Sequence, residues 1–291
     1  TGYPIAKVAT KIALGYTLVY GIIELINFAH GEIYMLGAFT ALLVAGVLGI
    51  VGFPAGGILI VAALAAVVWS AAYGYTLEKV AYKPLRGAPR LSPLISAIGM
   101  SIFLQNYVLL AQTSDYVPFP RLLPEMEFLD YLGNIMGPSD FLILVTSTLA
   151  MVSLSLFIRY TRMGKAMRAT AQNRKMALLL GINADRIISL TFIVGSALAA
   201  LGGVLIASHM GQVNFGIGFL AGLKAFTAAV LGGIGSIPGA MVGGLVLGIA
   251  ESMTTGYLSG NYEDALAFAL LILILIFRPD GILGKAKVQK V

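Results

Sequence analysis

Long apolar runs recur along the whole chain and restrict its fold more than any other feature. A window of about 19 residues, the length of a helix that crosses a bilayer, finds about nine of them. They lie near residues 4–24, 32–51, 56–77, 92–111, 140–158, 187–207, 217–234, 237–255 and 264–277. Lipid accepts only backbones whose polar groups are paired internally, so each run is expected to be a helix. The sequence predicts an all-α polytopic membrane protein with about nine transmembrane helices (8–10), in one domain over residues 1–291.

Composition and missing motifs exclude several other classes. The chain is 58% hydrophobic and 11% charged, whereas a soluble domain is about a quarter charged. It has no cysteine, so disulfides and thiolate metal sites are excluded. It has no GxxxxGK[ST] phosphate loop and no cluster with metal-ligand spacing. His30 and His209 are solitary, and each is expected to be a packed or interfacial residue rather than a catalytic one. We therefore expect neither an enzyme nor a metal site.

The charged residues between the apolar runs are sorted by sign. The loops 78–91 and 159–186 and the tail after residue 277 are basic, whereas the loop 112–139 is acidic. The basic residues are Lys79, Lys83, Arg86, Arg90, Arg159, Arg162, Lys165, Arg168, Arg174, Lys175, Arg186, Arg278, Lys285, Lys287 and Lys290. The positive-inside rule places all three basic segments, and so the carboxyl terminus, in the cytoplasm. The net charge of +6 then reflects orientation, and no nucleic-acid partner is expected.

Two polar stretches interrupt apolar runs and resemble each other. With the chain aligned to itself at an offset of 187 residues, INFAHG, which begins at Ile26, lies over VNFGIG, which begins at Val213. The stretches share an Asn-Phe pair and a glycine three residues after the Phe. We interpret residues 1–158 and 187–277 as repeat halves, inverted because five predicted spans separate the copies. Inverted repeats with matched helix breaks are typical of alternating-access transporters.

A broken helix in lipid leaves backbone groups unpaired unless they line a cavity or are buried in protein. The two breaks are therefore expected to mark a solute route. The predicted pathway residues are Asn27, Phe28, His30, Gly31, Asn214, Phe215 and Gly218. The alternative is that each stretch is an ordinary loop with a helix-capping asparagine.

The basic loop 159–186 is too patterned for a linker. Strong helix formers predict one helix from Lys165 to Leu180, ended by Gly181. One side of that helix would carry small, nearly uncharged residues: Ala166, Ala169, Asn173, Ala177 and Leu180. Such a stripe would fit a groove on another protein and bury nothing against the membrane spans. The alternative is a basic interfacial helix on anionic lipid, with Arg162, Lys165 and Arg168 meeting phosphates.

Few ionisable residues fall within the predicted spans. Lys224 and Glu251 lie on successive spans at similar depth and are expected to form an ion pair. Glu24, Glu32 and Glu251 are the carboxylates that an ion-coupled secondary transporter would use, which is a rival function.

Four stretches carry a resemblance that extends over nearly the whole chain. They are GYTLVYGIIELINFAHGEIYMLGAF, EKVAYKPLRGAPRLSPLISAIGMSIFLQNYV, RMGKAMRATAQNRKMALLLGIN and AGLKAFTAAVLGGIGSIPGAMVGGLVLGIAES. They resemble the membrane permeases of bacterial branched-chain amino acid ABC importers, specifically the smaller of the two paired permeases. The start of the chain departs from that family, with Lys7 and Lys11 where the family is more apolar, so the start of the first span stays open.

The resemblance implies a multi-pass permease of the bacterial plasma (inner) membrane for branched-chain or other neutral amino acids. It implies that a second homologous permease, two ATP-binding subunits and an extracytoplasmic solute-binding protein are partners, besides membrane lipid. ATP is then bound by the partner subunits, and this chain binds no cofactor. The loop would contain the coupling helix, with coupling residues Lys165, Ala166, Arg168, Ala169, Asn173, Ala177 and Gly181. A closely related alternative cargo is urea or short amides.

Overall fold

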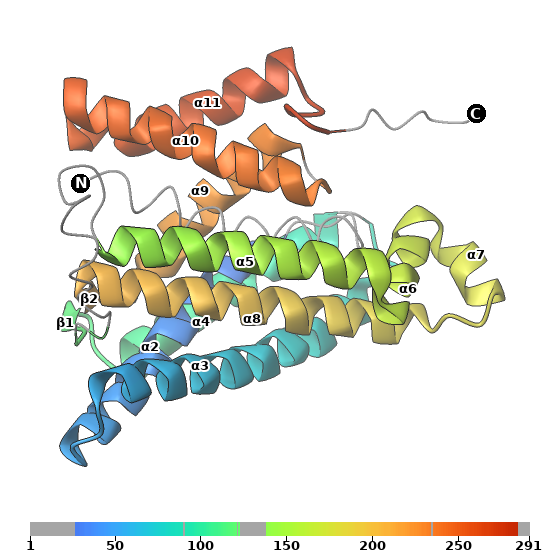
Figure 1. Ribbon diagram of the computed structural model, residues 1–291. Coiled ribbons are helices and arrows are strands. Elements are labelled where there is room, and N and C mark those ends of the chain that lie inside the picture. The colour runs from blue at the N-terminus through green and yellow to red at the C-terminus, as the bar shows by residue number, and fades with distance from the viewer. Residues whose placement is uncertain (1–26, 90, 121, 123–137, 234, 285–291) are drawn as a thin grey trace.

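The structure is a computed structural model that describes residues 27–89, 91–120, 122, 138–233 and 235–284. These residues form a bundle of long helices with a helical hairpin at one end (Figure 1). The α-helices are α2 (His30–Ile50), α3 (Ala55–Leu77), α4 (Leu91–Ala111), α5 (Pro138–Tyr160), α6 (Arg162–Gln172), α7 (Arg174–Leu179), α8 (Ala184–Met210), α9 (Ile217–Gly232), α10 (Ile237–Tyr257) and α11 (Glu263–Phe277). The short elements are the π-helix η1 (Glu78–Tyr82), the 3-10 helices η2 (Lys83–Leu85) and η4 (Gly260–Tyr262), and the strands β1 (Val117–Pro118) and β2 (Gln212–Val213).

The fold class is confirmed, but the expected count of nine spans is not. Within the described residues, seven helices are long and apolar enough to cross a bilayer. The predicted first span, 4–24, lies outside the described residues. The predicted span 217–234 is α9, which has 16 residues and therefore rises only about 24 Å. Because a bilayer core is about 30 Å thick, α9 is too short to cross it upright.

Three helices, α2, α3 and α8, form the most closely packed part of the molecule. A Cβ added to Gly37 of α2 would lie 2.7 Å from the Cα of Ala200 on α8, and one added to Gly203 of α8 would lie 2.3 Å from the carbonyl oxygen of Tyr34 on α2. On α3, a Cβ added to Gly74 would overlap the side chain of Ser196 on α8. These helices approach backbone to backbone because small residues stand at the crossings.

The helices α9, α10 and α11 form a second group, which joins the first through α2 and α9. A Cβ on Gly243 of α10 would lie 2.0 Å from the carbonyl oxygen of Ala228 on α9. After α11 the chain folds back on the end of α9. The amides of Ile282 and Leu283 donate to the carbonyl oxygens of Leu231 and Gly232, each at 2.9 Å.

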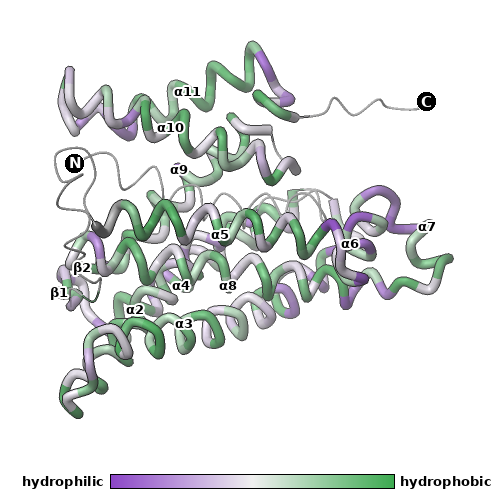
Figure 2. Tube along the Cα trace, in the orientation of Figure 1, coloured by the Kyte–Doolittle hydropathy of each residue, from purple (hydrophilic) through white to green (hydrophobic). Residues whose placement is uncertain are grey.

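Polar residues concentrate at the two ends of the bundle, and the long helices between them are mainly apolar (Figure 2). The end that carries α6, α7, η1, η2 and the residues after α11 will be called the basic end (Figure 1). The strand pair β1–β2 lies at the opposite end, where Val117 is opposite Val213 in an antiparallel register. Both basic loops thus lie on the same side, as the charge pattern predicted.

Candidate functional site

The two polar stretches adopt the same turn at equivalent positions. The helices α2 and α9 start at His30 and Ile217, which are separated by the same 187 residues as the aligned copies. The amide of His30 donates to the carbonyl oxygen of Asn27 at 3.1 Å, and the amide of Ile217 donates to that of Asn214 at 3.4 Å. Neither asparagine caps its helix through its side chain. The matched sequence therefore encodes a matched backbone turn, and not a pair of asparagine caps.

The glycines of the two turns meet where α2 crosses α9. A Cβ added to Gly31 would lie 2.2 Å from the carbonyl oxygen of Gly218 and 2.9 Å from the Cα of Gly222. A Cβ added to Gly218 would lie 2.7 Å from the carbonyl oxygen of Gly31. Any larger residue at either position must push the helices apart. The two copies of the repeat thus meet at one contact, between Gly31 and Gly218, which we call the glycine crossing.

The first copy places buried polar groups beside this crossing. Asn27 is 2% exposed, and its Oδ1 accepts a hydrogen bond of 3.0 Å from the hydroxyl of Tyr82. Glu32 is fully buried, and its Oε1 accepts a hydrogen bond of 3.0 Å from the Oγ of Ser101 on α4. Asn27 Nδ2 and Glu32 Oε2 have no hydrogen-bond partner among the described residues. The Oε2 of Glu32 lies 2.5 Å from the place where a Cβ of Gly218 would stand.

The other predicted pathway residues are less tightly gathered. His30 is buried at the first turn of α2. The ring of Phe28 packs against Phe226 of α9 at a centroid distance of 6.1 Å, while Asn214 and Phe215 are half-buried. Glu32 was absent from the predicted pathway, although its position five residues after Asn27 within an apolar run was a usable signal.

The predicted single helix from Lys165 to Leu180 is wrong, because the chain forms two helices. Asn173 has φ −158° and ψ 104°, which ends α6, and its Oδ1 accepts a hydrogen bond of 3.0 Å from the amide of Met176 at the start of α7. Asparagine is among the strongest N-capping residues, which outweighs the helix formers around it. The predicted stripe is therefore divided between two helices and does not form one face.

The expectation that this segment buries nothing is also wrong. Met167 and Ala177 are each 1% exposed. A Cβ on Gly164 would lie 2.4 Å from the Cα of Ile158 at the end of α5. The hairpin therefore packs against the spans from which it emerges.

The outward surface of the hairpin differs from the predicted one. Lys165, Arg168 and Asn173 are exposed, and Ala166 and Ala169 are half-exposed. Gly181 has φ 79°, and the amides of Gly181 and Ile182 donate to the carbonyls of Leu178 and Ala177, which is the Schellman ending expected of a helix-terminating glycine. The largest apolar surface is at the tip, where Leu179 and Leu180 are 81% and 76% exposed.

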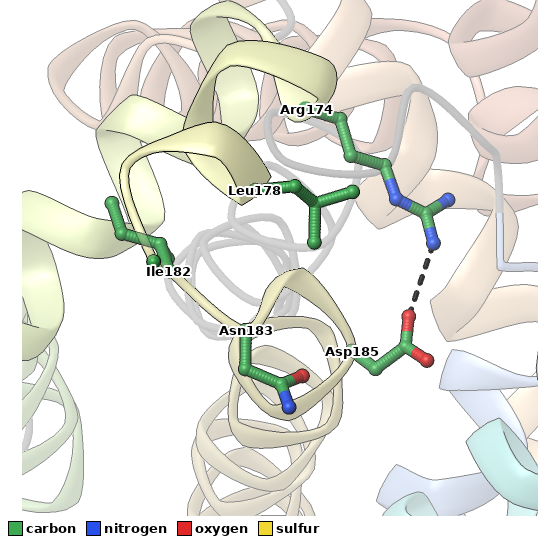
Figure 3. Close-up of a pocket in the computed structure, with 6 residues that line it drawn as sticks. Arg174, Leu178, Ile182, Asn183 and Asp185 are labelled. Carbon is green, nitrogen blue, oxygen red and sulfur yellow. Dashed lines mark hydrogen bonds and ion pairs between the residues drawn. The ribbon is translucent and has the colours of Figure 1, made fainter.

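A charge network holds the hairpin to the basic end. Asp185, at the start of α8, forms ion pairs with Arg86 and with Arg174, the latter at 3.0 Å. Arg86 also pairs with the fully buried Glu78 of η1, whose Oε2 accepts a hydrogen bond of 2.7 Å from Ser189. Below the hairpin is a pocket of about 440 Å³ lined by Arg174, Leu178, Gly181, Ile182, Asn183 and Asp185 (Figure 3). The network thus connects α7 with η1 and α8.

The predicted pair Lys224 and Glu251 lies within a larger cluster. The Nζ of Lys224 lies 3.3 Å from Glu251 Oε1, 2.6 Å from Glu263 Oε1 and 2.9 Å from Asp264 Oδ1. Glu251 is fully buried on α10, whereas Glu263 and Asp264 open α11. The sequence pattern did not include these last two because they stand at the edge of an apolar run.

Comparison with known families agrees with this architecture. The family described as "Branched-chain amino acid transport system / permease component" matches residues 7–275. The chain belongs to this family. The high-affinity branched-chain amino acid transport system permease protein LivH of Escherichia coli K12 is 51% identical, over 100% of this chain and 96% of that protein. BraD of Pseudomonas aeruginosa, with the same description, is also 51% identical over the same shares.

Two further proteins are less similar to this chain or match only part of it. The permease protein LivM of Escherichia coli K12 is 30% identical over 56% of this chain and 39% of that protein. Among solved structures, PsaBC from Streptococcus pneumoniae in complex with Fab has a TM-score of 0.47 at 14% identity, over 96% of this chain and 91% of that chain.

Proposed function

We propose that this chain is the smaller of two paired permeases in an ABC importer for branched-chain amino acids. The observation that carries the proposal is the 51% identity to LivH over all of this chain. The chain then lies in the bacterial inner membrane with its basic end and carboxyl terminus in the cytoplasm, as the charge pattern favours. The second permease, two ATPase subunits and an extracytoplasmic solute-binding protein complete the machine. This subunit itself binds no ATP and catalyses no reaction.

The solute route in this proposal passes the glycine crossing. An amino acid brings an ammonium group, a carboxylate and an apolar side chain. The unpaired Glu32 Oε2 suits the ammonium group, the unpaired Asn27 Nδ2 suits the carboxylate, and the Phe28–Phe226 pair suits the side chain. Unpaired buried polar groups are costly, which supports a role in binding.

Coupling to the ATPase takes place at the hairpin in this proposal. The exposed leucines at its tip, Leu179 and Leu180, and the half-exposed Ala169 supply the docking surface. The network through Asp185 links that surface to η1 and α8. ATPase movement would therefore reach the spans through packed contacts and ion pairs.

Replacement of Leu179 and Leu180 by glutamate tests this coupling. We expect the doubly substituted permease to lose ATPase subunits on co-purification and to lose uptake, with little change in thermal stability because both side chains are exposed. Val51, which directly follows α2 and is 73% exposed, is the matched control for an added glutamate. Retention of full ATPase association and uptake by the variant would refute the docking surface.

The cargo is tested separately in liposomes that contain the complete importer. We expect ATP-dependent uptake of labelled leucine, isoleucine and valine, and no uptake of labelled urea. Uptake of urea and not of these amino acids would show that the cargo is urea. Uptake of the amino acids in liposomes that lack the ATPase subunits would favour the secondary transporter.

A further inference from the structure

A second cavity at the basic end lies outside both the solute route and the docking surface. Its volume is about 510 Å³. The lining residues are Tyr75, Lys79, Lys83, Met163, Asn183, Asp185, Arg186, Ser189, Leu190 and Ile193. It lies where α3 ends, α6 starts and α8 starts, so that its wall combines loop residues with transmembrane ones.

The polar part of this cavity has an excess of positive charge. Lys79, Lys83 and Arg186 line it, and none of them forms an ion pair with a described residue. The one acidic lining residue, Asp185, is already paired with Arg86 and Arg174. Three cations without an acidic partner among the described residues therefore line one cavity.

The other part of the cavity is apolar and leads toward the membrane. Leu190 and Ile193 belong to the first turns of α8, and Ile193 stands about 10 Å along the helix axis from Arg186. Tyr75 is in the last turn of α3, and the Nζ of Lys79 lies 5.2 Å from the centre of its ring. A tyrosine beside a lysine is typical of the boundary between lipid tails and headgroups.

The elements that contribute Tyr75 and Lys79 to the cavity, α3 and η1, also carry exposed apolar side chains. Val68 on α3 is 69% exposed and Val80 on η1 is 62% exposed. A molecule that lies in the cavity and continues along this surface needs an anionic head and an apolar tail. A free phosphate ion would use the cations and leave the apolar wall unused.

We propose that this cavity binds one anionic phospholipid, with its phosphate between Lys79, Lys83 and Arg186 and an acyl chain along Leu190 and Ile193. The site lies apart from the glycine crossing and from the docking leucines, Leu179 and Leu180, none of which lines the cavity. Met163 of α6 lines the same cavity, so the lipid also touches the start of the coupling hairpin.

The test uses the purified importer complex and native mass spectrometry after addition of phosphatidylglycerol or phosphatidylcholine. We expect the native permease to retain phosphatidylglycerol in preference to phosphatidylcholine. Each basic residue near an anionic headgroup contributes about fivefold in affinity, so Lys79→Gln, Lys83→Gln and Arg186→Gln together should weaken retention about a hundredfold. Lys83→Gln alone, at an exposed position, should weaken it about fivefold.

Two further variants separate this site from a general effect of charge. Lys165→Gln, Arg168→Gln and Lys175→Gln together remove the same charge from the hairpin and should leave retention unchanged. Leu190→Trp narrows the apolar wall without altering charge and should reduce retention. The proposal is overturned if the control triple variant loses lipid equally, or if Leu190→Trp retains it fully.

The same measurements distinguish two other possible occupants of the cavity. If inorganic phosphate displaces the bound phosphatidylglycerol, the cavity is a phosphate site and not a lipid site. If the three substitutions in the cavity leave lipid retention unchanged but release the ATPase subunits, the cavity is a protein interface. Either result rejects the proposal.

Discussion

The two matched stretches share a backbone turn but differ in their chemistry. Both start a helix after the same turn, at His30 and at Ile217. Two residues further on, the first copy has the fully buried Glu32, whereas the second has Phe219, which is 50% exposed. The matched residues thus specify where the two helices start and cross, while the residues that differ between the copies decide what each copy contacts.

The same contrast recurs one and a half turns further along each helix. Gly37 in α2 allows close contact with Ala200 of α8, and the equivalent residue in α9 is Lys224, which faces three carboxylates on α10 and α11. The first copy thus uses this position for packing and the second for charge. The predictions below test whether this division is real.

The largest effect is expected at Lys224. Its replacement by methionine leaves Glu251 fully buried without its counter-charge, which should lower the free energy of unfolding by about 3–5 kcal/mol. Glu251→Gln should cost less, because Lys224 keeps Glu263 and Asp264. The double variant should be more stable than Lys224→Met alone. Denaturant unfolding of all three variants in detergent measures the cycle, and additive losses would contradict the pairing.

The glycine crossing should give the next largest effect. A methyl group at Gly31 collides with backbone atoms of α9, so Gly31→Ala should cost about 1–3 kcal/mol and abolish uptake. Gly46, on the same helix, has no atom within 4 Å of an added Cβ, and Gly46→Ala is therefore the control. Thermal unfolding and uptake would both be measured. Equal behaviour of the two variants would show that the crossing does not hold α2 against α9.

A smaller difference is expected between the matched asparagines. Asn27→Ala removes the buried acceptor of the Tyr82 hydroxyl and should cost about 1–2 kcal/mol. Asn214 is half-buried, and Asn214→Ala should cost about 0.5 kcal/mol or less. If the two substitutions lower stability and uptake by equal amounts, the two asparagines have the same role and the proposed difference between the copies is wrong. Thermal stability with uptake at low solute concentration provides the comparison.

The smallest effect concerns a position that the copies share completely. The hydroxyls of Thr40 and Thr227 donate to the carbonyls of Leu36 and Leu223, at 2.7 Å and 3.0 Å. Thr→Val at either position should change the free energy of unfolding by about 0.6 kcal/mol or less, and by similar amounts. A large effect in one copy only would show that its hydroxyl has a role beyond its own helix.

The sequence predicted the features that depend on nearby residues. The apolar runs predicted the helices, and the offset of 187 residues predicted the two matched turns, because both follow from local pattern. The contact between Gly31 and Gly218 was not predictable, since an internal alignment relates positions without bringing them together. The partners of Lys224 were missed for a related reason: Glu263 and Asp264 lie on a third helix.

The coupling segment shows where local patterns are misleading. Its composition favours one helix, and Asn173 was assigned to a face of that helix, although asparagine also ends helices and caps the next. Whether Ala177 faces outward depends on how α7 lies against α6 and α8, which no spacing within the segment reveals. The exposed leucines at the tip do not belong to a stripe of small residues, so the pattern that predicted the coupling face could not indicate them.

The backbone hydrogen bonds between the segment after α11 and the end of α9 constrain the order in which the protein is built. The carbonyls of Leu231 and Gly232 receive the amides of Ile282 and Leu283, which the ribosome adds only after all of α10 and α11. During synthesis the end of α9 is therefore an open helix terminus for the time needed to make two more helices. The end of α9 therefore cannot complete its backbone hydrogen bonds until the segment after α11 has been made.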